Sequence, residues 1–183
     1  MKGVVFTEFV EFAEERFGLG VADDMIARCT LPSGGAYTAI GTYDHGELVQ
    51  MVGQLSALSG KPVAELLRGF GAHLLKRFAS SFPGFFAHAS VFDFLHRVDD
   101  TIHVEVRKLY PDAELPAFSC EQPEPDRLVM VYQSHRGMAD LAEGLIAGAI
   151  AHFRENVQVR RDDLTTDGPQ KIRFTLTRQP PGA

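Results

Sequence analysis

The stretch Tyr132-Gln133-Ser134-His135-Arg136 places three hydrogen-bond donors at every second position. Side chains two residues apart project to the same side of an extended segment, so a phenol, a hydroxyl and a guanidinium would converge there. This combination suits a carboxylate or a phosphate, because the fork of arginine can bind such groups with two hydrogen bonds. The spacing also allows a purely structural role, in which Ser134 caps the next helix, Tyr132 packs and Arg136 pairs with a surface acid.

His103 is the second side chain whose type could do chemistry. A neutral imidazole is the commonest metal ligand in proteins. Asp99 and Asp100, four and three residues earlier on a helix, could instead hold a protonated imidazole at this position. These two aspartates point about 100° apart on a helix, which makes them a poor acid/base pair and favours a solvated face. Spacing alone leaves the role of His103 open.

Sequence signatures of common enzymes are missing from this chain. It has no P-loop, no G-x-G-x-x-G after a strand, no G-x-S-x-G and no H-E-x-x-H. Its two cysteines, Cys29 and Cys120, make neither a disulfide framework nor a zinc site, and inert buried thiols are the simpler interpretation. The net charge of −6 argues against nucleic acid or an anionic membrane as a partner. We therefore expect a protein that is not an enzyme.

Length and composition fit one soluble globular domain. The 183 residues suffice for a single core, and 45% of them are hydrophobic and 23% charged. No run is long and apolar enough to span a bilayer. Met1-Lys2-Gly3 leads straight into an amphipathic pattern without a signal peptide, so the expected location is cytoplasmic.

Hydrophobic periodicity predicts that the first half is helical. The predicted helices cover residues 3–17, 22–29, 44–58 and 63–78, with a loop over 30–42. The element that would present His103 is predicted as one continuous helix over Ser90–Leu109. Ser90 and Asp93 form a typical capping box at its start. Its apolar stripe consists of Val91, Leu95, Val98, Ile102, Val106 and Leu109.

In the second half, the residue pattern predicts strands near 117–121, 127–133, 157–161 and 171–178, with one helix inserted over 138–153. The fold class is therefore α+β, a helical N-terminal half followed by a small antiparallel sheet. We expect one domain over 1–183, with a helical part at about 1–62, the remainder at about 63–178 and a tail at 179–183. Gly144 and Gly148 on the inserted helix would let something flat and large approach closely.

Together these residues resemble the haem-nitric oxide/oxygen-binding (H-NOX) domain family, which includes the haem domain of soluble guanylate cyclase. The resemblance rests on Met1-Lys2-Gly3, Asp100-Thr101-Ile102-His103, Pro116 and Tyr132-x-Ser134-x-Arg136, and it extends from Met1 to about Arg178 in family order. The motif Tyr-x-Ser-x-Arg together with an upstream helical histidine is specific for the family, whereas each of these sequence features alone is weak evidence for it. The resemblance implies haem b (Fe protoporphyrin IX) between the helical part and the sheet.

The resemblance also implies a role for each matching residue. His103 would be the axial ligand of the iron, Tyr132, Ser134 and Arg136 would bind the propionates, and Pro116 would distort the porphyrin. The haem and distal pocket would consist of apolar residues, namely Val5, Phe9, Leu74, Phe78, Leu141 and Leu145. We expect His73, next to Leu74, to face solvent or a neighbouring helix.

Leu141 stands where family members that bind O₂ stably carry a tyrosine. Bound O₂ gains from a hydrogen-bond donor and NO on ferrous haem needs none. The resemblance therefore implies a stand-alone bacterial sensor that binds NO, and also CO, and discriminates against O₂. It would signal through release of His103 and movement of its helix to a histidine kinase or a cyclic-di-GMP cyclase or phosphodiesterase.

Two alternatives remain open at this point. One is a haem-free small-molecule-binding or scaffold module with the same fold, which would be colourless. The other is a haem enzyme that turns over NO or peroxide, which the apolar distal residues argue against because such chemistry needs a placed acid or base.

Overall fold

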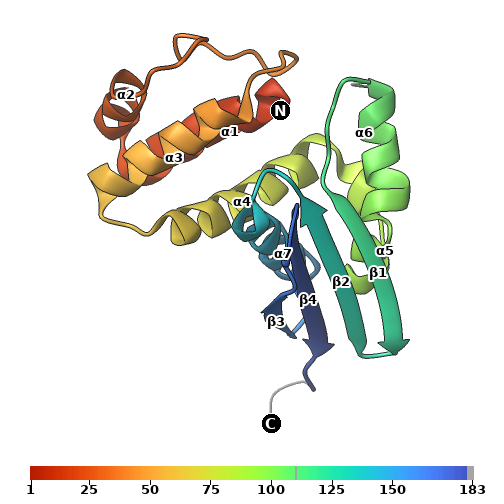
Figure 1. Ribbon diagram of the computed structural model, residues 1–183. Helices are drawn as coiled ribbons and strands as arrows, with labels where there is room; N and C mark the ends of the chain where they lie inside the picture. Colours follow the sequence, from red (N-terminus) through yellow and green to blue (C-terminus); the bar gives the residue numbers. More distant parts are fainter. Residues whose placement is uncertain (110, 181–183) are drawn as a thin grey trace.

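The computed structural model describes residues 1–109 and 111–180 (Figure 1). The helical elements are α1 (Gly3–Phe17), α2 (Leu19–Ala27), α3 (His45–Ser59), α4 (Val63–Ser81), the 3-10 turn η1 (Pro83–Phe86), α5 (Val91–His96), the π-helical turn η2 (Val98–Ile102), α6 (His103–Leu109) and α7 (Ala139–Phe153). The strands are β1 (Ala117–Glu124), β2 (Arg127–Ser134), β3 (Val157–Asp163) and β4 (Gln170–Arg178). The predicted α+β class, a helical half followed by a sheet with one inserted helix, is confirmed. The predicted tail at 179–183 lies mostly outside the described residues.

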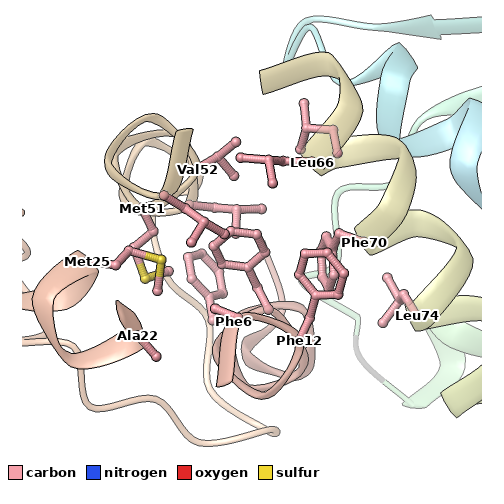
Figure 2. Close-up of a cluster of buried hydrophobic side chains, with 14 of the residues drawn as sticks. Phe6, Phe12, Ala22, Met25, Met51, Val52, Leu66, Phe70 and Leu74 are labelled. Atoms are coloured by element: carbon pink, nitrogen blue, oxygen red, sulfur yellow. The ribbon is translucent and has the colours of Figure 1, made fainter. Parts of the chain in front are cut away.

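The helical half is built around phenylalanine rings (Figure 2). Phe6, Phe9 and Phe12 recur on one face of α1 and are buried. The ring of Phe9 meets that of Phe70 on α4 edge-on, with their centroids 5.0 Å apart. Edge-to-face contacts of this kind add to the burial of large apolar area, so α1 and α4 are held firmly together.

The sheet is antiparallel with the strand order β1-β2-β4-β3. Alternate residues of the two central strands are buried, as the period of a strand requires. Met130 pairs with Phe174 and Tyr132 with Ile172 across the β2–β4 ladder. This apolar face packs against α7, where Ala142, Ile146 and Ala149 are buried in the same cluster.

Helices α4 and α7 cross at glycine residues. A Cβ built at Gly144 would collide with the carbonyl oxygen of Arg68, and one at Gly148 would lie 3.0 Å from the Cβ of Leu75. Gly71 on α4 faces the backbone of α7 in the same way. The prediction that the glycines of the inserted helix admit a large flat group was therefore wrong, because the partner that approaches them is α4.

The prediction of one continuous helix over Ser90–Leu109 was also wrong. Ser90 caps α5 as predicted, since its Oγ accepts a hydrogen bond from the N–H of Asp93 at 3.1 Å. The helix is then interrupted after His96 by η2, in which the N–H of Ile102 donates to the carbonyl of Arg97 at 3.1 Å. This hydrogen bond joins residues five apart, one more than in an α-helix. The extra residue in the turn rotates the following residues about the helix axis, so the predicted apolar stripe does not continue on one face. Turns of this kind are frequent at functional sites.

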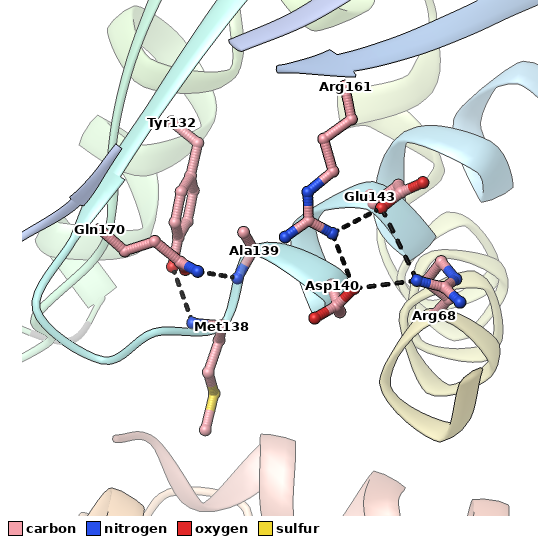
Figure 3. A network of polar contacts seen from close by, with 8 residues as sticks. All are labelled: Arg68, Tyr132, Met138, Ala139, Asp140, Glu143, Arg161 and Gln170. Carbon is pink, nitrogen blue, oxygen red and sulfur yellow. Dashed lines mark hydrogen bonds and ion pairs between the residues drawn. The ribbon is translucent and has the colours of Figure 1, made fainter. Parts of the chain in front are cut away.

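Polar contacts fix the start of α7 (Figure 3). The guanidinium of Arg161 on β3 lies 2.7 Å from Asp140 and 2.9 Å from Glu143, and Arg68 on α4 lies 2.9 Å from Asp140. The N–H of Ala139 donates to the side-chain oxygen of Gln170 at 3.1 Å. The turn between β2 and α7 is therefore anchored to both the sheet and α4. In the described part of the chain, no helix has the length and apolar character needed to cross a membrane.

Candidate functional site

A cavity of about 340 Å³ lies between the helical half and the sheet. Its walls come from α1, α4, α5, η2, α6, the loop 111–116, β1, β2 and α7. Most of its lining is apolar and includes Val4, Leu75, Phe82, Phe85, Phe86, Phe94, Leu95, Val98, Ile102, Val106, Phe118, Met130, Ala142 and Ile146. A cavity of this kind, apolar with a few converging polar groups, is the usual form of a ligand site. A polar hollow of about 390 Å³ beside α5 contains none of the predicted site residues.

The cavity brings together all but one of the residues that the sequence singled out. The predicted residues that line it are His103, Pro116, Tyr132, Ser134, Arg136, Val5, Leu74, Phe78, Leu141 and Leu145. Phe9 does not line it, because its ring points into the helical core and is fully buried there. Elements far apart in the sequence thus converge on one site.

His103 is the first residue of α6, and its side chain is only 12% exposed. Its Nδ1 lies 3.0 Å from Oδ1 of Asp99, and the same oxygen accepts a hydrogen bond from the N–H of Phe118 at 3.4 Å. Asp99 therefore ties the imidazole to β1. Asp100 is exposed, as the predicted solvated face requires, whereas Asp99 is only partly exposed because its carboxylate makes these two contacts.

The protonation state of His103 suits a metal ligand. Burial lowers the pKa of His103, and the hydrogen bond to Asp99 opposes that shift only in part. The neutral form with its proton on Nδ1 directs the lone pair of Nε2 away from Asp99. No group in the described part of the chain hydrogen-bonds this Nε2. A carboxylate behind the imidazole is the usual way to fix a ligating histidine in this tautomer.

Tyr132 and Ser134 end β2, and Arg136 lies in the following turn and not in an extended strand. The Oγ of Ser134 accepts a hydrogen bond from the N–H of Arg136 at 3.2 Å, and the Oη of Tyr132 accepts one from the N–H of Met138 at 3.3 Å. Burial raises the pKa of Tyr132, so its hydroxyl keeps a proton to donate. The guanidinium of Arg136 donates to the carbonyl and to the carboxylate of Glu114, both at 2.7 Å.

The wall that α1, α4 and α7 form is apolar. The side chains that α1, α4 and α7 contribute to the lining are Val4, Val5, Leu74, Leu75, Phe78, Leu141, Ala142, Leu145 and Ile146. His73 turns away from the cavity and faces α1, with Nε2 3.5 Å from Glu8 and Nδ1 3.7 Å from Glu15. The expectation that His73 faces solvent or a neighbouring helix is confirmed, and the cavity gains no polar group from it.

These residues fit a haem group. A porphyrin needs a large apolar slot, its iron needs a neutral imidazole, and its two propionates need cations or hydrogen-bond donors at one end. The cavity offers the slot, the Nε2 of His103 and the polar set of Tyr132, Ser134 and Arg136. Pro116 would contact the porphyrin from the loop that enters β1.

Three polar residues at the rim escaped the sequence reasoning, namely Lys2, Asp112 and Glu114. Lys2 and Glu114 line the cavity, and Asp112 pairs with Lys2. Both acids belong to an irregular loop, whose side-chain directions follow no period. The spacing of Asp99 and His103 was a local signal that pointed to a contact which the structure contains.

Comparison with known proteins agrees with this geometry. A family model described as Haem-NO-binding matches residues 2–161. The H-NOX protein of K. algicida in the Fe(II) unliganded state is 35% identical, with a TM-score of 0.92 over 99% of this chain and 98% of that chain. The IWP-051-bound H-NOX of Shewanella woodyi in the Fe(II)CO state is 41% identical, with a TM-score of 0.85 over 100% of this chain and 97% of that chain.

A third structure supports the fold alone. The H-NOX protein of S. oneidensis in the Fe(II)NO state is 24% identical, with a TM-score of 0.88 over 98% of this chain and 100% of that chain. No curated protein sequence matches the chain significantly. Because the family model spans most of the sequence and solved relatives align over nearly all of it, this chain belongs to the Haem-NO-binding (H-NOX) family of haem-based gas sensors.

Proposed function

We propose that this protein is a nitric oxide sensor that holds haem b between its helical half and its sheet. One observation carries the proposal, namely that an apolar cavity contains a neutral imidazole on one wall and a cationic rim at one end. When bound, haem supplies a ferrous iron that takes NO or CO. His103 ligates that iron, Tyr132, Ser134 and Arg136 hold the propionates, and Pro116 presses on the porphyrin face.

The choice among gases follows from the wall opposite His103. Leu74 and Leu141 present no hydrogen-bond donor, and Val5 extends the same apolar surface from α1. Bound O₂ carries partial negative charge that an apolar wall leaves unstabilised, whereas NO and CO are far less polar. The protein therefore binds NO and CO and discriminates against O₂.

Signalling begins at His103. Asp99 and the π-helical turn η2 hold α6 at its first residue, so the imidazole is the tether between α6 and the cofactor. Bound haem would supply the NO-binding iron, and release of His103 from it would let α6 move with respect to the helical part at about 1–62. Such a shift carries a signal only if a partner binds the two arrangements with different affinity.

The partner that this proposal names is a histidine kinase, or a cyclic-di-GMP cyclase or phosphodiesterase, in keeping with stand-alone bacterial members. The Haem-NO-binding family model and the H-NOX structure with Fe(II)CO support NO and CO as the ligands. The competing function is a haem-free binding or scaffold module. The placement of Asp99 behind His103 argues against it, because a haem-free pocket has no need of an oriented imidazole.

Amide hydrogen exchange tests the signalling step. We expect NO to raise exchange in η2 and α6 of the ferrous protein, because release of His103 frees the start of α6. The CO form is the matched control, since CO fills the iron site without weakening the opposite bond as NO does. Exchange in α3, which does not line the cavity, should stay the same. Equal protection of α6 in the NO and CO forms would contradict the proposed release.

A further inference from the structure

Two cations at the rim of the cavity are each paired with a carboxylate from the same short loop. The Nζ of Lys2 lies 3.3 Å from Oδ1 of Asp112, and the Nη2 of Arg136 lies 2.7 Å from Oε2 of Glu114. Thr42 reinforces the first pair by donating its hydroxyl to Oδ2 of Asp112 at 2.6 Å. Both acids belong to the loop 111–116, which follows α6 and leads into β1.

We propose that Asp112 and Glu114 compete with the two carboxylates of the cofactor for Lys2 and Arg136. The proposal rests on the haem-binding function proposed above and adds Lys2 as a second cation for the propionates. Haem has two propionates at one edge, and the rim has two cations that the loop already pairs with two acids.

The exposure of the four side chains shows which member of each ion pair the propionates can replace. The side chains of Lys2 and Arg136 are 11% and 17% exposed, whereas those of Asp112 and Glu114 are 57% and 84% exposed. A cation with so little access to water needs an anionic partner, because an unpaired buried charge is costly. The carboxylate of Glu114 can swing into water at little cost, and that of Asp112 can do so by giving up the hydrogen bond from Thr42. Incoming carboxylates can therefore replace them without moving the cations.

The exchange has two consequences. The loop acids compete with the propionates, so they lower the affinity of the protein for haem. Pro116 lies two residues beyond Glu114 in the same loop, so displacement of the Glu114 carboxylate leaves Arg136 attached to this segment only through the carbonyl of Glu114. Asp112 and Glu114 are thus positioning residues that act through Lys2 and Arg136 without touching the cofactor.

Haem transfer to apomyoglobin tests the proposal directly. The double variant Asp112→Asn/Glu114→Gln should release haem more slowly than the unmodified protein, on the order of tenfold for two partly exposed ion pairs. The control Asp23→Asn/Glu121→Gln changes the net charge by the same amount at exposed positions for which the described part of the chain shows no ion pair. Its release rate should match that of the unmodified protein.

The dimethyl ester of haem provides the second arm, because it lacks the negative charges that compete with the loop. Its release rate should be the same from the double variant and from the unmodified protein. Faster release of haem from the double variant, or the same change with the ester, would overturn the proposal. If the double variant does not fold, Asp112→Asn and Glu114→Gln are measured singly, and each should slow release. Absence of haem binding in every protein, the control included, would contradict the proposed function itself.

Discussion

Replacing His103 by glycine is expected to lower haem retention at least about 100-fold, because loss of an outer-shell partner of a ligand alone typically costs 10- to 100-fold in metal affinity. The cavity offers no second imidazole among its described lining residues. The haem that remains should lose the spectrum of a histidine-ligated iron. Added imidazole should restore it, since the glycine leaves a space of the same shape.

The matched control for this variant is His96→Gly, which removes an exposed imidazole at the end of α5. Haem content and spectrum of this control should be unchanged. If the variant at His103 kept the haem content and spectrum of the unmodified protein, His103 would not be the iron ligand.

The variant Leu141→Tyr is expected to bind O₂ more tightly than the unmodified protein. Leu141 lines the cavity on its apolar wall. In the proposed function this wall faces the gas, so a phenol there can donate a hydrogen bond to bound O₂. A hydrogen bond to a charged group contributes about 1.5–3 kcal/mol, so the affinity for O₂ should rise about 10- to 100-fold. Titration of the ferrous protein with O₂, followed by absorption, measures the change.

Leu141→Phe is the control, because it has nearly the bulk of tyrosine without the hydroxyl. It should leave the affinity for O₂ unchanged while altering the packing to the same degree. Equal O₂ affinity in the tyrosine and phenylalanine variants would show that residue 141 does not reach the bound gas.

The sequence was sufficient to predict the regular elements, because their apolar periods are strong. The face of α1 that carries Phe6, Phe9 and Phe12 and the alternation of β4 are local patterns, and the structure contains both elements close to the predicted bounds. The polar site residues were found through short motifs, since Tyr132, Ser134 and Arg136 recur at a fixed spacing. Their roles toward haem stay proposals.

Features that depend on a distant partner could not be predicted from the sequence. From the sequence alone, the π-helical turn η2 looked like ordinary helix. The hydrogen bond between Asp99 and the backbone of Phe118 on β1 joins segments far apart in the sequence, so no local pattern reveals it. Gly144 indicated a close approach correctly, but nothing local says that the approaching group is α4. Phe9 shares a helix with Val5, and only the packing on Phe70 shows that it faces the core and not the cavity.

The most direct test of the central claim is the absorption spectrum of the ferrous protein without air, before and after NO and then with O₂. We predict a five-coordinate ferrous haem that becomes a five-coordinate NO complex and does not respond to O₂. This result would require a single protein ligand, an apolar gas site and release of His103. A stable O₂ complex would contradict the apolar gas site, and a six-coordinate NO complex would contradict the release of His103. Absence of a Soret band after reconstitution with haem would leave the haem-free module as the function of this fold.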